Sequence, residues 1–189
     1  MTGYKRQQII ISGVGGQGVI FLTRLLAEAA IRKGESVFTS ETHGMAQRGG
    51  TVISHLKVGN FSSPLIRPFK ADGLLALRMD GLEQHGAYLK PGSWAVVNHS
   101  KHDTSESDRP VFFVEADRIA QKINNPRSVN LILLGFAMAV ILKNVDNPFF
   151  CSLKDIKTVL ENQMGDKQKM LNASLTAIET GYEVGENTK

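Results

Sequence analysis

The residues best suited to bind a ligand form a glycine-rich turn near the start of the chain. Gly13-Val14-Gly15-Gly16-Gln17-Gly18 fits the pattern G-x-G-x-x-G and stands between an apolar run and an amphipathic run. Glycine lets the backbone turn tightly and approach a ligand closely. Free N–H groups at the start of the following helix, together with the helix dipole, favour a phosphate. The same glycines could instead serve only to pack a strand against a helix, and the pattern leaves both interpretations open.

A second candidate segment is the polar stretch Glu41-Thr42-His43-Gly44-Met45-Ala46-Gln47-Arg48-Gly49-Gly50, which we interpret as a loop. Arg48 could hold a phosphate or a carboxylate through two parallel hydrogen bonds, although a salt bridge within the fold is the commoner fate of one arginine. His43 has no identifiable nucleophile or second acid beside it. We therefore interpret His43 as an interface or hydrogen-bonding residue and expect no catalytic residue in this chain.

Glu41 keeps a different class of function open. In dinucleotide-binding folds, an acid about 20 residues after the glycine turn holds a ribose hydroxyl. Glu41 follows Gly18 by 23 positions. A stand-alone NAD-binding dehydrogenase is therefore an alternative, and its weakness is that Glu41 belongs to a polar loop.

The elements that must position these residues follow from the spacing of apolar side chains. Strands are expected at 7–12, 36–39, 51–58, 73–77, 94–98 and 111–115. Helices are expected at 19–33, 80–88, 117–123, 129–142, 152–163 and 167–182. The alternation predicts an α/β fold, a three-layer domain with a mostly parallel sheet and helices on both faces. We expect one domain over residues 1–189.

Several details of these elements are specific enough to check. The segment Val129–Leu142 is apolar nearly all round, which predicts a helix buried against the sheet. Ser152 and Asp155 have the spacing of a capping box at a helix start. The last helix is expected to turn four side chains inward, namely Met170, Leu171, Leu175 and Ile178. Lys90-Pro91-Gly92 is expected to end the helix that precedes it.

Composition excludes several kinds of protein. The 189 residues carry a net charge of +4, with the basic residues scattered rather than in a run, so we expect no nucleic-acid partner. The longest apolar stretch, Leu131 to Leu142, is too short to span a bilayer, so we expect no membrane partner and a cytoplasmic protein. Cys151 is the single cysteine, which excludes an internal disulfide and a cysteine-ligated iron–sulfur cluster.

The histidines do not suggest a metal site. His55 alternates with apolar residues and is interpreted as a strand residue. His85, His99 and His102 stand in polar surroundings without the spacing of metal ligands. We therefore predict no metal bound by this chain.

The glycine turn and the loop after it, taken together with later motifs, resemble one family. The chain is similar to the gamma subunit, or gamma domain, of 2-oxoacid:ferredoxin oxidoreductases. Beyond the Gly13–Gly18 turn, the matching residues are Arg48-Gly49-Gly50, Ser63-Pro64-Leu65-Ile66, Asn130 with Leu134-Gly135, and Asn172, Ala177 and Gly181-Tyr182. The resemblance covers roughly Gln8 to Tyr182. The form of the Glu41–Gly50 segment looks most like the indolepyruvate branch, in which this subunit is called beta.

The resemblance implies that the complete enzyme decarboxylates a 2-oxoacid on thiamine diphosphate, passes electrons through iron–sulfur clusters to ferredoxin and transfers the acyl group to coenzyme A. Thiamine diphosphate, its magnesium and the clusters would belong to partner subunits. This chain has no Gly-Asp-Gly with a downstream asparagine pair of the kind that binds thiamine diphosphate. It would then be a non-catalytic subunit that is inactive alone.

Our hypothesis for the candidate site is that Gly13, Gly15, Gly16, Gln17, Gly18 and Arg48 help to bind coenzyme A. A phosphate-suited turn with a cation nearby motivates it. The competing interpretation is that both motifs only form a subunit interface, in which case the chain is a pure scaffold.

Overall fold

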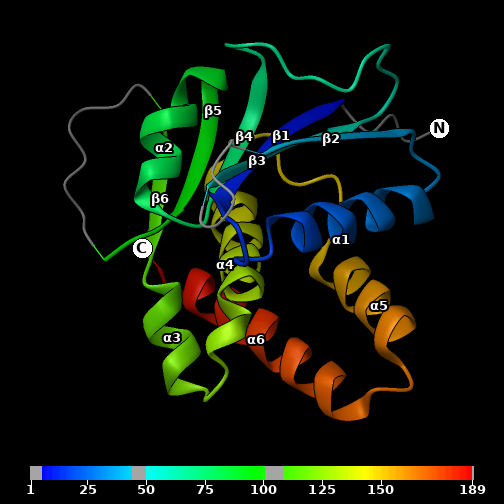
Figure 1. Cartoon of the computed structure of the whole chain (residues 1–189), viewed down its shortest axis with the longest axis vertical. Helices are drawn as coiled ribbons and strands as arrows, with labels where there is room; N and C mark the ends of the chain where they lie inside the picture. Colours follow the sequence, from blue (N-terminus) through cyan, green and yellow to red (C-terminus); the bar gives the residue numbers. More distant parts are fainter. Residues whose placement is uncertain (1–5, 44–49, 101–108, 189) are drawn as a thin grey trace.

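The computed structural model describes residues 6–43, 50–100 and 109–188, which form a sheet covered by helices (Figure 1). The strands are β1 (Gln7–Val14), β2 (Val37–His43), β3 (Thr51–Val58), β4 (Ala71–Ala76), β5 (Leu89–Asn98) and β6 (Val111–Val114). The helices are α1 (Val19–Arg32), α2 (Met79–His85), α3 (Ala116–Lys122), α4 (Val129–Asn144), α5 (Leu153–Met164) and α6 (Gln168–Asn187). Two short 3₁₀ turns, η1 (Gly86–Tyr88) and η2 (Pro126–Ser128), lie between them.

The strands form one sheet in the order β2-β3-β1-β4-β5-β6. The β1–β4, β4–β5 and β5–β6 pairs are parallel, whereas β3 pairs antiparallel with both β1 and β2. All strands except β3 therefore run in one direction, which confirms the predicted mostly parallel α/β fold. The opening β1–α1–β2 unit differs from a simple crossover because β3 is inserted between β1 and β2.

One face of the sheet carries most of the helices. Helices α1, α4, α5 and α6 lie below the sheet in Figure 1, and α4 is the central one. Residues Asn130 to Ile141 of α4 are all buried, which confirms the prediction of a buried helix for this segment. By length and composition the helical span Pro126–Asn144, which is η2 with α4, could also cross a membrane, but burial between the sheet and α6 explains its apolar surface.

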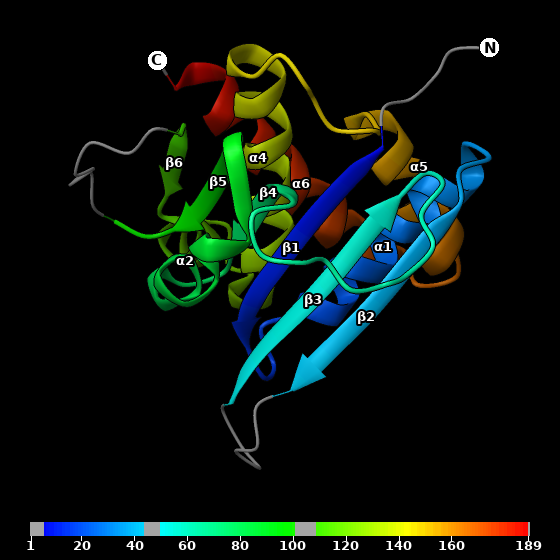
Figure 2. The ribbon, with the colours of Figure 1, turned by 90° about the horizontal axis from the view of Figure 1, so that it is seen from above.

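The second face is covered by helix α2 and by the irregular segment from Gly59 to Lys70, here called the 59–70 connection (Figure 2). The connection joins β3 to β4 and passes over the sheet, where Ile66 is buried in a small apolar cluster with Ile10, Ile53 and Leu74. Helices thus lie on both faces, as predicted, but with only the short α2 and η1 on this side.

Helices α4 and α6 cross at close range because glycines line the crossing. A Cβ atom on Gly135 would lie 2.0 Å from the carbonyl oxygen of Ile178, and one on Gly181 would lie 2.1 Å from that of Ile132. Gly185 meets Phe136 in the same way. The glycines of two motifs from the family resemblance therefore have a packing function.

Two element predictions were wrong in part. The expected loop from Ser40 begins later, because β2 continues through Glu41 and Thr42 to His43 by pairing with β3. Lys90-Pro91-Gly92 does not end a helix but belongs to β5, where the register against β4 shifts between Ala71 and Gly73. That irregularity tolerates a proline without an N–H donor.

The inner face of α6 also differs from the prediction. Leu171 and Ile178 are buried as expected, but Met170 has 50% of its surface exposed. Position 170 lies in the first turn of α6, where periodicity alone placed its side chain wrongly.

Candidate functional site

The candidate site lies at the carboxyl edge of the parallel strands, where open α/β sheets bind ligands. The glycine turn leaves this edge after β1, and the β2–β3 hairpin turns back beside it. The backbone N–H of Gly15 donates to the carbonyl oxygen of Gly50 at 3.2 Å. The two motifs that sequence analysis singled out are therefore adjacent at Gly50.

The four glycines of the turn have two different functions. A Cβ on Gly13 would lie 2.9 Å from both Gln17 Oε1 and a methyl of Val19. A Cβ on Gly18 would lie 2.2 Å from Asn130 Nδ2, and Gly18 also has a φ of +84°. Gly13 and Gly18 are therefore required by packing.

Gly15 and Gly16 differ because their surroundings are open. No heavy atom of the described residues lies within 4 Å of a Cβ built on either one, and both are exposed. Gly16 has a φ of +91°, which glycine adopts without strain. Among the described residues, none blocks the approach of another molecule to the backbone at these two positions.

Gln17 is turned back into its own loop. Its Oε1 accepts from the backbone N–H of Val14 at 2.9 Å, and its backbone N–H donates to the carbonyl oxygen of Val14 at 3.1 Å. The side chain thus stabilises the turn. Sequence analysis predicted a ligand contact for Gln17, and the geometry gives its amide oxygen a structural partner.

The start of α1 supplies backbone donors next to this turn. The first hydrogen bond at the helix start runs from Leu22 N to the carbonyl oxygen of Gly18 at 3.0 Å, and no side chain caps the helix. The N–H groups of the first helical turn therefore have no acceptor within α1 itself. Buried Asn130, at the start of α4, lies against Gly18 and brings a second helix start to this edge.

Arg48 lies outside the described residues, so its predicted role stays a prediction. Glu41 is described, and its place argues against the dinucleotide alternative. Glu41 pairs with Ser54 of β3, while β3 separates β2 from β1. Two strand spacings, about 10 Å, therefore separate Glu41's strand from the strand that ends in the glycine turn, whereas the dinucleotide fold needs them adjacent.

Asn98 is a structural residue of this edge that sequence analysis missed. Its Nδ2 donates to the carbonyl oxygen of Leu77 at 3.2 Å and to Asp117 Oδ2 at 2.6 Å, and its Oδ1 accepts from Ala116 N at 2.9 Å. One buried amide thus ties β4, β5 and α3 together. A polar residue directly after the apolar run 94–97 was the available signal.

A polar group lies on the other side of β1. The Ser12 hydroxyl and Nδ1 of His85 are 2.8 Å apart, and the His85 ring lies near Tyr88. A serine beside a histidine resembles a nucleophile with its base. The cavity next to Ser12, however, measures only about 10 Å³, room for no more than a water molecule, so the pair is structural.

His55 is a buried strand residue, as predicted. Its Nδ1 accepts a hydrogen bond from the backbone N–H of Ile66 at 3.2 Å, so the ring proton belongs on Nε2. Burial, then the charges of His85 and Lys57, lower the pKa of His55. Burial likewise lowers the pKa of His85, and a backbone hydrogen bond at Gly81 opposes that shift.

Larger cavities lie elsewhere. One of about 340 Å³ lies between β6, α3 and the end of α6, and its charged lining includes Glu115 and Arg118, which pair with each other at 3.1 Å. Another of about 260 Å³ borders the buried thiol of Cys151, whose pKa is raised by burial. Within the ranges 6–43, 50–100 and 109–188, no group of three His, Cys, Asp or Glu side chains could hold a metal.

Comparison with known proteins gives a consistent result. Residues 8–184 match the family model described as pyruvate ferredoxin/flavodoxin oxidoreductase. Indolepyruvate oxidoreductase subunit IorB of Archaeoglobus fulgidus is 28% identical, with 94% of each chain covered. IorB of Methanothermobacter thermautotrophicus is 33% identical, over 69% of this chain and 77% of the relative.

Solved structures share the fold. The gamma subunit of a keto/oxoacid ferredoxin oxidoreductase from Geobacter sulfurreducens superposes with a TM-score of 0.74 at 21% identity, covering 96% of this chain and 99% of that one. The 2-oxoglutarate:ferredoxin oxidoreductase of Magnetococcus marinus, solved with 2-oxoglutarate, coenzyme A and succinyl-CoA bound, gives a TM-score of 0.77 at 25% identity. This chain covers 32% of that protein, with 99% of its own length aligned.

Proposed function

Because the chain belongs to the pyruvate ferredoxin/flavodoxin oxidoreductase family, we propose that it is the non-catalytic small subunit of a cytoplasmic 2-oxoacid:ferredoxin oxidoreductase. The observation that carries the proposal is the end-to-end match to separate small subunits, covering 94% of the A. fulgidus relative and 99% of the G. sulfurreducens chain. The complete enzyme would convert a 2-oxoacid to an acyl-CoA and reduce ferredoxin.

The redox groups of such an enzyme do not fit this chain. An iron–sulfur cluster needs several thiolates, whereas the sequence has only Cys151, which is buried and whose pKa burial raises. The sequence also lacks the Gly-Asp-Gly segment expected to bind thiamine diphosphate through magnesium. We therefore assign thiamine diphosphate, magnesium and the clusters to partner subunits, through which ferredoxin is reduced.

We further propose that the open part of the glycine turn helps to bind a phosphate of coenzyme A. Among the described residues, nothing covers the backbone at Gly15 and Gly16 and no side chain caps the start of α1, which carries the positive end of a helix dipole. Arg48 stands two residues before Gly50, whose carbonyl oxygen accepts from Gly15. Gly13, Gln17 and Gly18 would hold the turn in shape rather than touch the ligand.

The substitution Gly15→Ala tests this role with little risk to the fold. Gly15 has no positive φ, and a Cβ built on it would contact no described residue. An added methyl group would therefore project only into the space proposed for the ligand. In the assembled complex, we expect Gly15→Ala and Arg48→Ala each to raise the KM for coenzyme A about tenfold, which corresponds to about 1.4 kcal/mol. The KM for the 2-oxoacid should stay unchanged.

Gly86→Ala is the matched control, because its Cβ would meet only Leu82 Cδ1, at 3.9 Å, and its φ is −57°. If Gly15→Ala and Arg48→Ala leave the KM for coenzyme A at the control value, the turn does not bind it. Loss of assembly in these variants, with an unchanged KM in the complex that does form, would favour the scaffold interpretation.

A further inference from the structure

A surface far from the glycine turn combines exposed apolar side chains with cations. It is the outward side of the 59–70 connection, with the adjacent part of the β2–β3 hairpin and Arg6 (the 59–70 surface). The connection joins the end of β3 to the start of β4. Because β3 runs opposite to β1, this surface lies at the amino edge of the parallel strands, at the other end of the sheet from Gly15.

Three large apolar side chains are exposed on this surface. Phe69 has 64% of its surface exposed, Leu65 has 53% and Phe38 has 37%. Phe38 stands directly opposite Lys57 in the β2–β3 pair, so both point to the face that the connection crosses. Phe69 and Leu65 both belong to the connection, and exposed apolar side chains on one short segment are typical of interaction sites.

The charged side chains of β3 and of the 59–70 connection are all positive. Residues 51–70 contain Lys57, Arg67 and Lys70 but no Asp or Glu. Arg6 and Lys57 both lie over the ring of Phe61, at 5.4 and 5.1 Å from its centroid. In the described part of the chain, none of Lys57, Arg67 and Lys70 forms an ion pair with a carboxylate.

Lys57 makes this charge unusual because the residue is only 6% exposed. Burial, then the nearby charge of Arg67, lower its pKa. The positive charges of Lys57 and Arg67 repel each other, and an anion placed beside them would offset this repulsion. An acidic group that docks here would supply that anion.

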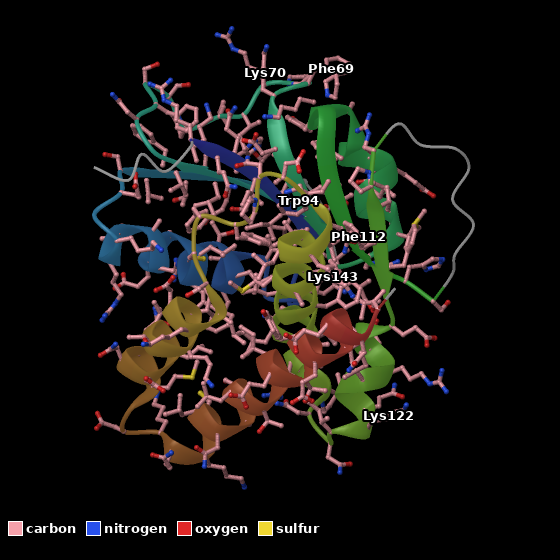
Figure 3. The ribbon with its side chains drawn as sticks, turned by 180° about the vertical axis from the view of Figure 1, so that it is seen from behind. Phe69, Lys70, Trp94, Phe112, Lys122 and Lys143 are labelled. Atoms are coloured by element: carbon pink, nitrogen blue, oxygen red, sulfur yellow. The ribbon has the colours of Figure 1, made fainter. Side chains whose placement is uncertain are left out.

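The backbone holds Phe69 in its exposed position. The N–H of Phe69 donates to the carbonyl oxygen of Ala87 at 3.0 Å, and the N–H of Lys70 donates to the carbonyl oxygen of Tyr88 at 2.9 Å. Phe69 has a φ of +59°, which a non-glycine residue adopts only at a cost. Figure 3 shows Phe69 and Lys70 projecting from one end of the molecule. A fixed, exposed aromatic side chain suits the anchor of an interface.

We propose that the 59–70 surface docks an acidic region of the thiamine-bearing partner subunit, with Phe69 and Leu65 as apolar anchors. This inference rests on the proposed function, which supplies the partner. A second copy of this chain fits less well, because a two-fold contact would place the same cations against each other. The surface is remote from the proposed coenzyme A site, so the two can be tested separately.

The first test reverses charge. The double variant Arg67→Glu/Lys70→Glu should bind the separately purified partner subunit at least about tenfold more weakly at low salt, and with less salt dependence, than the wild-type chain. The control is Lys122→Glu/Lys169→Glu, which makes the same charge change at exposed positions on α3 and α6. Binding is measured by sedimentation or biolayer interferometry over a series of salt concentrations.

The second test removes the aromatic anchor without weakening the fold. Phe69→Gly relieves the positive φ, so the midpoint of urea unfolding should stay the same or rise, while affinity for the partner falls about tenfold or more. Met170→Ala, which trims a half-exposed apolar side chain on α6, should leave the affinity unchanged.

The outcomes separate the two proposals. If the wild-type chain and the partner do not associate, the proposed function fails and this docking surface fails with it. If they associate and the 59–70 variants bind as the controls do, only the docking surface is wrong. It is equally wrong if the isolated chain dimerises and the 59–70 variants abolish that dimer instead.

Discussion

At the scale of single residues, the position of each polar side chain decides its role. The Ser12–His85 pair could be taken for catalytic groups by residue type, yet it has no room for a substrate. Gln17 has an amide suited to a ligand, but the amide oxygen accepts from Val14 within the turn. Gly15 and Gly16, which have no side chains, are the accessible part of the motif.

His55 predicts a pH dependence of stability. Its pKa is lowered in the folded chain from the usual value of about 6.5, with burial as the main cause. Below about pH 6.5 the unfolded chain therefore takes up a proton before the folded chain does, so the free energy of unfolding decreases as pH falls. Above that pH, this contribution is fully present.

The substitution His55→Gln keeps an acceptor for the N–H of Ile66 but removes the titration. We expect urea unfolding at a series of pH values from about 7.5 to about 5 to give a smaller loss of stability in His55→Gln than in the wild-type chain. Because the pKa of His85 is lowered too, His55→Gln/His85→Gln should flatten the curve further. A profile that is identical for all three proteins would contradict this expectation.

At the scale of elements, the crossing of α4 and α6 is the part most sensitive to substitution. The glycines bring the two backbones so close that no methyl group fits between them. Overpacking of this kind forces the backbones apart and costs about 1–3 kcal/mol or more. The crossing also positions the start of α4, where Asn130 lies against the glycine turn.

We therefore expect Gly135→Ala and Gly181→Ala each to lower the free energy of unfolding by about 3 kcal/mol, measured by urea denaturation. The gain in helix propensity, about 1 kcal/mol, acts in the opposite direction and should be outweighed. Gly86→Ala should change stability little, because its Cβ position is open. Two glycine variants as stable as the wild-type chain would show that the helices do not pack as closely as described.

At the scale of the whole molecule, the chain combines a candidate site at the carboxyl edge of the sheet with a charged apolar surface at the amino edge. The part of the chain described in the structure has no metal-binding cluster, and the sequence has one thiol. Under the proposed function, other subunits carry the redox groups, the carboxyl edge is the proposed ligand site and the amino edge is the proposed docking surface.

This arrangement predicts that the purified chain alone does not reduce ferredoxin with any 2-oxoacid in the presence of coenzyme A. Adding the partner subunits should restore the reaction, because they would carry thiamine diphosphate and the clusters. Anaerobic reduction of ferredoxin, followed by its absorbance, measures both states. Ferredoxin reduction by this chain without partners would contradict the assignment.

Much of the fold was predictable from local sequence. The strand, glycine turn and helix at 7–32 follow from residue types within one segment, as does the all-round apolar α4. The capping box of Ser152 and Asp155 forms as predicted, with hydrogen bonds between both residues in each direction. The ordered motifs also identified the family. Local spacing suffices for these features because each depends on neighbours within a few residues.

Only the tertiary structure decided which segments lie side by side. The insertion of β3 between β1 and β2, which separates Glu41 from the glycine turn, depends on hydrogen bonds between distant strands. Gly18 is packed whereas Gly15 is open, because the side chain of Asn130, more than 100 positions away in the sequence, lies against Gly18. The spacing of apolar residues shows which face of a helix or strand is apolar, but not which element packs against that face. The packing partner is decided by burial over the whole chain.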